Sequence, residues 1–149
     1  MNYKQSPKNE ADTCREYVVP KLQRVGWDQS PHSIAEQHPI TDGRIITVGQ
    51  GARRLASKRP DYLLRYAPHH TIAVVEAKRI GKTPGAGLQQ AKQYAEMLGL
   101  CFAYATNGQG IVEYDYVTGV ERELAEFPIP DELWARCTIL LRPKQFNIC

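Results

Sequence analysis

The residues most able to do chemistry together are two acids and one lysine. Asp61 follows Pro60, and the sequence Glu76-Ala77-Lys78 begins 15 residues after Asp61. Two carboxylates can bind a hard divalent cation through oxygen, and an ammonium group beside them can stabilise negative charge. Groups of this kind can hydrolyse a phosphate ester, provided that the chain brings all three side chains to one place.

A hairpin would bring these side chains together. We predict that residues 61–66 and 71–78 form two antiparallel strands joined by a four-residue loop. In that register Asp61 lies directly opposite Glu76, and directly opposed residues have Cβ atoms about 5 Å apart on one face of a sheet. Lys78 shares this face because it follows Glu76 by two residues. A slip of one residue would send Asp61 to the other face.

Two opposed carboxylates repel each other, so this arrangement needs a compensating charge. Lys78 offsets part of the repulsion. A divalent cation held by Asp61 and Glu76 would offset more, and Mg²⁺ or Mn²⁺ suits oxygen ligands best. Such a cation lowers the pKa of water and neutralises charge on a phosphate, while Lys78 could orient the water or stabilise the transition state. The alternative is an acid pair that Lys78 and Arg59 simply neutralise at the surface.

Two helices are expected to frame the hairpin. Asn9 is a favourable N-cap, and apolar residues at helical spacing predict a helix over 10–25, in which Pro20 should produce a kink or a break. Thr83-Pro84 predicts the start of a second helix, and Gly99 predicts its end. The hairpin therefore lies between two helices in the sequence.

Further strands complete an α/β pattern. The acidic segment 121–132 contains two prolines and is predicted to be a linker or lid, with a short helix starting at Asp131. We expect a central mixed sheet flanked by helices, in the order helix, three strands, helix, strand, strand. The additional strands are predicted at 34–38, 44–48, 101–106 and 111–116.

Basic residues gather in the middle of the sequence, although the net charge is only +3. Residues 53–82 hold eight basic side chains and two acids, whereas residues 113–132 hold seven acids and one arginine. A local basic field suits a polyanion such as nucleic acid, although a solvated surface can have the same composition. We predict DNA-backbone contacts from Arg53, Arg54, Lys58, Arg59, Arg79 and Lys82.

The remaining composition is that of an intracellular protein of one domain. The chain has 149 residues, no apolar run near the roughly 20 residues of a membrane span, and no N-terminal signal segment. Its four cysteines show no CxxC spacing, so we expect neither a structural zinc site nor disulfides, and we expect Cys14 and Cys101 to pack as small hydrophobes. Gly81-Lys82-Thr83 copies the end of a P-loop, but Glu76 stands where that loop needs glycine, so no nucleotide site is expected.

Several segments, in order, resemble one known family. The residues RPD at 59–61 and EAK at 76–78 resemble the PD-(D/E)xK nuclease motif, and Gln90 with Tyr94 resembles the QxxxY motif of its RecB-like branch. The wider series is similar to the N-terminal nuclease domain of the restriction (R) subunit of type I restriction enzymes. Over about residues 9–137 it comprises NEADTCREYVVPKL, GW, RPDYLLRY, VVEAKR, QAKQYAE, ATNG and FPIPDELW.

The resemblance implies a restriction-endonuclease-like core and a DNA endonuclease that depends on Mg²⁺ or Mn²⁺. By this resemblance, Asp61 and Glu76 would bind the metal, and Lys78 would be the catalytic lysine. Gln90 and Tyr94 would shape the site or contact DNA, although an ordinary polar helix edge would also account for them.

The resemblance also sets expectations for the whole chain and its partners. Residues 1–127 would be the nuclease domain and 128–149 a linker, short helix and tail, although the sequence after Cys137 departs from the family pattern. The motor domain would be absent, so ATP would be used only by a full-length enzyme. Double-stranded DNA and the modification and specificity subunits would be partners in a prokaryotic cytoplasm, with no membrane involved.

Both the ligand set and the function have alternatives. Glu10 matches the place where this fold often supplies a third acid to the metal, but an acid in a first helical turn also stabilises the helix N-terminus. The function could instead be that of a stand-alone repair or resolvase-like nuclease of the same superfamily. It could also be that of a non-catalytic DNA-binding relic of the fold, or of an interaction module without a role in nucleic-acid chemistry.

Overall fold

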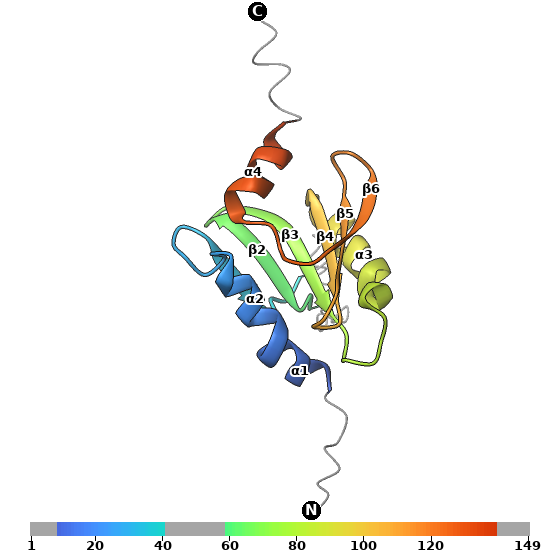
Figure 1. The fold of residues 1–149 in the computed structure, drawn as a ribbon. Coiled ribbons are helices and arrows are strands. Elements are labelled where there is room, and N and C mark those ends of the chain that lie inside the picture. Colours follow the sequence, from blue (N-terminus) through green and yellow to red (C-terminus); the bar gives the residue numbers. More distant parts are fainter. Residues whose placement is uncertain (1–8, 41–58, 140–149) are drawn as a thin grey trace, which may run out of the picture.

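A six-stranded mixed sheet organises the protein, and the computed structural model describes residues 9–40 and 59–139 (Figure 1). The strands lie side by side in chain order. They are β1 Ser33–Glu36, β2 Tyr62–Ala67, β3 His70–Ala77, β4 Phe102–Thr106, β5 Ile111–Asp115 and β6 Val120–Leu124. The first five agree with predicted strands to within a few residues, whereas the predicted strand at 44–48 lies outside the described residues.

Neighbouring strands are antiparallel, except for β3 and β4, which are parallel. Parallel neighbours need a crossover. After β3 the chain therefore passes through the 3₁₀ turn Pro84–Gly87 and α3 (Leu88–Leu98) before it begins β4. Gly99 ends α3 with φ 68°, a left-handed conformation that glycine adopts without steric cost, as predicted. The predicted α/β class, a mixed sheet flanked by helices, is confirmed.

The N-terminal helical stretch is not a uniform α-helix. It consists, in order, of α1 (Glu10–Thr13), a π-helical turn (Cys14–Val18) and α2 (Val19–Arg24). Asn9 caps α1, because its side chain accepts a hydrogen bond from the Asp12 amide at 2.8 Å. Pro20 lies in the first turn of α2, and because proline has no N–H it cannot continue the backbone hydrogen bonding of the helical turn before it. The break expected at Pro20 thus appears as the π-helical turn directly before it.

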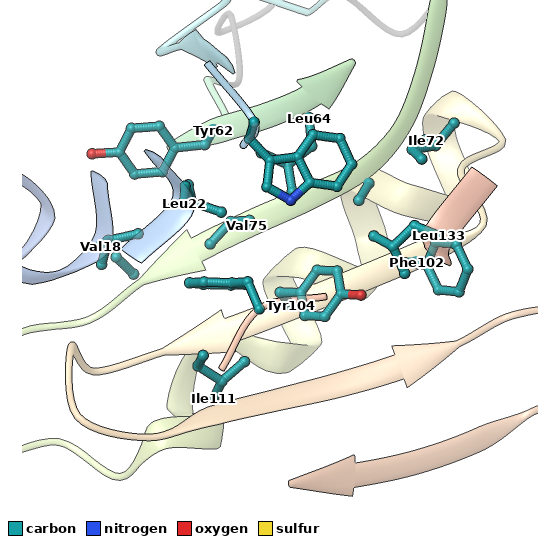
Figure 2. Packing of buried hydrophobic residues seen from close by; sticks show 14 of the residues in the cluster. Val18, Leu22, Tyr62, Leu64, Ile72, Val75, Phe102, Tyr104, Ile111 and Leu133 are labelled. Carbon is teal, nitrogen blue, oxygen red and sulfur yellow. The ribbon is translucent and has the colours of Figure 1, made fainter. Parts of the chain in front are cut away.

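Helices cover both faces of the sheet, because alternate strand residues point to opposite faces. On one face, Val18 and Leu22 of the N-terminal helices pack with Tyr104, as does Leu133 of α4 (Pro130–Thr138) (Figure 2). The opposite face is covered by α3, and its buried residues are Leu63, Val74, Ala91, Tyr94, Ala95 and Ala103. None of the helices in the described part of the chain is long and apolar enough to cross a membrane.

The acidic segment 121–132 differs from its prediction as a linker or lid. Its first part belongs to β6, which forms the edge of the sheet beside β5. The pairing is supported by an ion pair between Arg122 of β6 and the buried Glu113 of β5, at 3.0 Å. The prediction is wrong because prolines at 128 and 130 interrupt only the second part of the segment.

The predicted helix near Asp131 is present as α4, which begins at Pro130. This helix packs on the sheet through Leu133, which is fully buried in the core. The Trp27 indole also donates a hydrogen bond to the Pro128 carbonyl at 3.0 Å. The packed unit therefore continues beyond residue 127, which is the predicted end of the nuclease domain.

Cys101 and Cys137 form a disulfide that joins the residue before β4 to α4. The expectation that the chain has no disulfides is therefore wrong, whereas Cys101 does pack against the apolar core, as predicted. Because α4 lies against the sheet, the Cα atoms of the two cysteines approach to 5.8 Å despite 36 residues of separation. Cys14 is free and buried, in agreement with its predicted role as a small hydrophobe.

Candidate active site

Asp61 and Glu76 meet at one end of the β2–β3 hairpin. Tyr62 pairs with Val75, and the same antiparallel register places Asp61 opposite Glu76. The Asp61 amide donates a hydrogen bond to Glu76 Oε1 at 3.1 Å, and Asp61 Oδ2 accepts one from the Ala77 amide at 2.8 Å. The predicted register is therefore confirmed at this end, although two residues, not four, join the strands at the other end, where the pairing is irregular.

Burial changes the acidity of Glu76. The residue is 6% exposed, and this burial, together with the charge of Asp61, raises the pKa of its carboxyl group to about 8. The hydrogen bond from the Asp61 amide and the charge of Lys78 act in the opposite direction, but they do not outweigh the first two effects. Strongly shifted carboxyl groups gather at functional sites, so Glu76 is a candidate on physical grounds.

Lys78 follows β3 directly and is held by two contacts. Its amide donates a hydrogen bond to the Thr106 carbonyl at 2.8 Å, which continues the pairing of β3 with β4. Its Nζ lies 3.7 Å from Glu10 Oε1 in α1. The structure thus brings Glu10 and Lys78 to the end of the sheet at which Asp61 and Glu76 meet.

Asp61 and Glu76 suit a hard divalent cation, whereas Glu10, the third predicted ligand, is not grouped with them. In the described residues no three or more His, Cys, Asp or Glu side chains are grouped to hold a metal ion. Glu10, the third predicted ligand, is paired with Lys78 instead. Asp61 and Glu76 supply oxygen donors in close contact. The pKa of Glu76 is raised by burial and by the negative charge of Asp61, and a cation would neutralise that charge.

A pocket of about 340 Å³ opens beside Asp61. It lies between the N-terminal helical stretch, which contributes Glu10 and Arg15, and the end of β1, which contributes Gln37 as the residue following Glu36. The amide nitrogen Nε2 of Gln37 donates a hydrogen bond to Asp61 Oδ1 at 3.0 Å. The pocket therefore gives a ligand direct access to the Asp61 side of the carboxylate pair.

The two predicted site residues on α3 differ in their surroundings. Tyr94 is buried, and its pKa is raised by that burial and by the charges of Glu76 and Asp61, which places its hydroxyl within the field of the acid pair. Gln90 lies one helical turn earlier and is half-buried. Tyr94 therefore lies close enough to the acid pair to be affected by its charge. Gln90 lies on the same helix, α3.

Three of the predicted DNA-contacting side chains are described, and all three are exposed: Arg59, Arg79 and Lys82. Arg59 comes two residues before Asp61, and Arg79 comes directly after Lys78. These cations therefore lie in the segments that carry the site. Arg53, Arg54 and Lys58 lie outside the described residues.

Three residues that support the site are not among those predicted from the sequence. Gln37 contacts Asp61, and nothing in its predicted strand indicates this role. Gly87 lies against Glu76, since a Cβ at this position would be 3.3 Å from Glu76 Cβ. Asn107 is correctly predicted in a tight turn, but it also donates a hydrogen bond to the Lys82 carbonyl at 2.8 Å and so ties down the segment after Lys78.

The fold and the acid pair define an α/β protein of the restriction-endonuclease-like class. No protein-family model matches the sequence. The type I restriction enzyme EcoAI endonuclease subunit of Escherichia coli is 36% identical over 134 residues, which cover 85% of this chain and 16% of the relative. A solved fragment assigned as the HsdR subunit of a type I restriction enzyme from Vibrio vulnificus YJ016 has 53% identity and a TM-score of 0.81, covering 90% of this chain and 26% of that one. The chain is therefore homologous to one part of the endonuclease subunits of type I restriction enzymes, and it spans about a sixth of the curated relative's length.

Proposed function

We propose that this chain is the Mg²⁺-dependent nuclease part of a type I restriction enzyme endonuclease subunit, and that it hydrolyses phosphodiester bonds of double-stranded DNA. The observation that carries the proposal is the contact between Asp61 and the buried Glu76, with Lys78 next to them. Homology to restriction endonuclease subunits supports the same activity. Such an enzyme would also work with modification and specificity subunits.

Asp61 and Glu76 are the residues that would hold Mg²⁺ or Mn²⁺. When bound, the cation supplies Lewis-acid chemistry, because it makes water more acidic and neutralises charge on a phosphate group. Two backbone hydrogen bonds keep both carboxyl groups in place. The Ala77 amide donates to Asp61 Oδ2, and the Asp61 amide donates to Glu76 Oε1. Burial and the charge of Asp61 raise the pKa of Glu76, and a cation held there would favour the charged form, so Glu76 would give up its proton on loading.

Lys78 contributes a positive charge beside the reacting phosphate. In the ligand-free arrangement its Nζ lies 3.7 Å from the Glu10 carboxylate, and this contact keeps the flexible side chain at the site. A phosphodiester of DNA, which also carries one negative charge, would compete with Glu10 for the same ammonium group. Lys78 then stabilises the negative charge that grows on the phosphate oxygens in the transition state.

The exposed cations beside the site would hold the DNA backbone. Arg59, Arg79 and Lys82 lie on the segments that lead into or out of the acid pair. Contacts with phosphates fix the position of a duplex without reading its sequence. The module itself would therefore show little sequence preference, and target choice would come from a specificity subunit.

Replacement of Lys78 by alanine tests the catalytic proposal. We expect Lys78→Ala to lower the rate of Mg²⁺-dependent DNA cleavage by about 100-fold or more, because it removes a charge that stabilises the transition state. Affinity for DNA should stay close to that of the wild-type chain, because most phosphate contacts remain. Cleavage is measured on supercoiled plasmid, and DNA binding is measured by fluorescence anisotropy in Ca²⁺.

Lys21→Ala is the matched control, because Lys21 lies on α2 and contributes no contact to the acid pair. Its cleavage rate should equal that of the wild-type chain. Equal cleavage by Lys78→Ala and wild type would overturn the proposed mechanism. DNA binding by the wild-type chain without any Mg²⁺-dependent cleavage would favour the non-catalytic relic instead.

A further inference from the structure

Gln37 holds Asp61 from the side opposite Glu76. Its side-chain Nε2 donates a hydrogen bond to Asp61 Oδ1 at 3.0 Å, and its backbone amide donates a second to the Asp61 carbonyl, also at 3.0 Å. The carboxylate of Asp61 thus has a separate donor on each oxygen, because Oδ2 accepts from the Ala77 amide. Two donors on two oxygens fix the plane of a carboxylate, which one donor cannot do.

The register of the sheet explains how this contact arises. Glu36 pairs with Tyr62 across β1 and β2, and continuing that register by one residue brings Gln37 to Asp61. Asp61 in turn lies opposite Glu76 of β3. Gln37, Asp61 and Glu76 therefore form one row across the ends of β1, β2 and β3, with Asp61 in the middle.

The backbone of Gln37 is in a conformation that its residue type disfavours. Gln37 is the one non-glycine residue with positive φ in the described part of the chain, at 47°. Non-glycine residues in this left-handed region are uncommon, and the strain they carry is concentrated at functional sites. Here the left-handed backbone is the conformation that presents both the amide and the side chain of Gln37 to Asp61.

We propose that Gln37 is a positioning residue that orients the Asp61 carboxylate for a divalent cation and thereby sets the cation affinity of the site. This inference rests on the proposed function, because it assumes that Asp61 and Glu76 bind the cation. Gln37 also forms a wall of the pocket beside Asp61, so it acts where the ligand enters. Partners that orient a metal-binding side chain typically contribute a 10- to 100-fold gain in affinity.

Gln37→Asn tests the proposal in the full 149-residue chain. Asparagine tolerates left-handed backbone better than glutamine does, but its side chain is one methylene shorter and cannot reach Asp61 Oδ1. We expect the dissociation constant for Mn²⁺, measured by isothermal titration calorimetry, to rise about 10-fold or more. The Mg²⁺ concentration for half-maximal cleavage should rise in parallel, while the rate at saturating Mg²⁺ stays near that of wild type.

Gln37→Gly separates positioning from a structural role. Glycine relieves the left-handed strain and removes the side-chain donor, so the thermal midpoint without metal should hold or rise while Mn²⁺ affinity falls about 10-fold. A purely structural role for Gln37 predicts a lower midpoint with unchanged affinity. Gln29→Ala is the control, because Gln29 donates a comparable hydrogen bond to Asp28 at 3.3 Å on an exposed turn far along the chain from Asp61.

Two outcomes would count against the inference, and they can be told apart. If the wild-type chain binds Mn²⁺ and both Gln37 variants bind it equally well, the inference alone is overturned and the proposed function stands. If the wild-type chain binds no Mn²⁺, or if Asp61→Asn leaves the binding unchanged, the acid pair is not the cation site. The proposed function then fails, and the role of Gln37 fails with it.

Discussion

At Glu76 a carboxyl group lies inside the protein next to a second carboxyl group, and among the described residues no ion pair neutralises it. Burial and the charge of Asp61 raise its pKa to about 8, so near neutral pH it is largely protonated while no cation is bound. The fold accepts this unfavourable environment because the Asp61 amide still donates a hydrogen bond to the buried oxygen. Under the proposed function, this carboxyl group exchanges its proton for a divalent cation.

The close approach of Gly87 to Glu76 allows a test of whether packing at this point sets the position of the Glu76 carboxylate. In Gly87→Ala, the added Cβ would lie 3.3 Å from Glu76 Cβ and 3.6 Å from Lys78 Cε. The 3.3 Å contact requires Glu76 to shift by a few tenths of an ångström, whereas 3.6 Å from Lys78 is an ordinary contact distance. Displacement of a reacting group is costly to catalysis. We expect cleavage to fall about tenfold with little change in the thermal midpoint.

Gly85→Ala is the matched control for this variant. Its new Cβ would meet Val112 Cγ2 at 3.5 Å, which is an ordinary contact distance, and no site residue is near. A cleavage rate for Gly87→Ala that matches the rate for Gly85→Ala would show that the packing against Glu76 does not set the position of its carboxylate.

At the scale of secondary-structure elements, α4 is attached to the sheet by charge as well as by apolar packing. Arg136 of α4 donates hydrogen bonds to both oxygens of the fully buried Glu113 and to Asp115 Oδ2, with the shortest at 2.7 Å. Burial alone would raise the pKa values of both acids. Arg136 opposes that effect through its hydrogen bonds and its charge, together with further donors: Tyr104 and Arg122 at Glu113, and the Val117 and Thr118 amides at Asp115. Their combined effect holds both pKa values below their usual range. The disulfide between Cys101 and Cys137 attaches the same helix covalently.

These lowered pKa values predict how stability depends on pH. An acid whose pKa is lower in the folded state stabilises the fold above its unfolded pKa, and this stabilisation is lost as the pH falls through the folded value. The wild-type chain should therefore lose stability as the pH falls below about 4.5, the ordinary pKa of glutamate. In Arg136→Met the buried Glu113 has lost its main partner, so stability at pH 6 should be about 3 kcal/mol lower and should fall less steeply with acid.

Urea denaturation at pH 6, 4 and 3 measures both effects. The control is Arg24→Met, which removes only an exposed ion pair with Glu126 at 3.6 Å and should change stability by less than about 1 kcal/mol. If the two variants lost the same amount of stability, the buried network would not be what holds α4 to the sheet.

A contact fixed by a hairpin that is recognisable in the sequence could be predicted, whereas contacts that depend on the folded arrangement could not. The β2–β3 register was predictable, because hairpin geometry relates Asp61 to Glu76 through a short stretch of chain. The edge strand β6 was not, because its acidic composition gives no signal for the cross-strand pair of Arg122 with Glu113. The Gln37 contact was also inaccessible from sequence, since it depends on a left-handed backbone that glutamine seldom adopts.

At the scale of the whole molecule, the charges are divided between two regions of the chain. The described cations Arg59, Arg79 and Lys82 accompany the acid pair, whereas β6 carries Glu121 and Glu123 at the edge of the sheet. This separation matters because DNA binding depends on the local field and not on the net charge of +3. A duplex that approached through the acidic edge would be repelled, so the field favours approach near the site.

The salt dependence of DNA binding tests this arrangement. We expect the logarithm of the binding constant to fall linearly with the logarithm of salt concentration, because each phosphate contact releases condensed counterions. Lys82→Ala should make the slope shallower by about one unit and weaken binding to all sequences alike. Fluorescence anisotropy between 50 and 200 mM salt, roughly the range over which such effects are large, measures the slope.

Arg24→Ala serves as the control for this measurement, because Arg24 is exposed and paired with Glu126 away from the acid pair. Its slope should match that of the wild-type chain. A slope that Lys82→Ala does not change would mean that the DNA lies elsewhere on the surface.

The single parallel pairing in the sheet divides the fold into two antiparallel meanders, β1–β2–β3 and β4–β5–β6 (Figure 1). Strands within each meander pair with their neighbours in sequence, whereas joining the meanders requires the α3 crossover. The acid pair lies wholly in the first meander, but the Lys78 amide is held by the Thr106 carbonyl of the second. A chain in which only the first meander had formed would therefore bring its two acids together without fixing its lysine. Under the proposed function, such a chain would have its two cation ligands in place before its lysine.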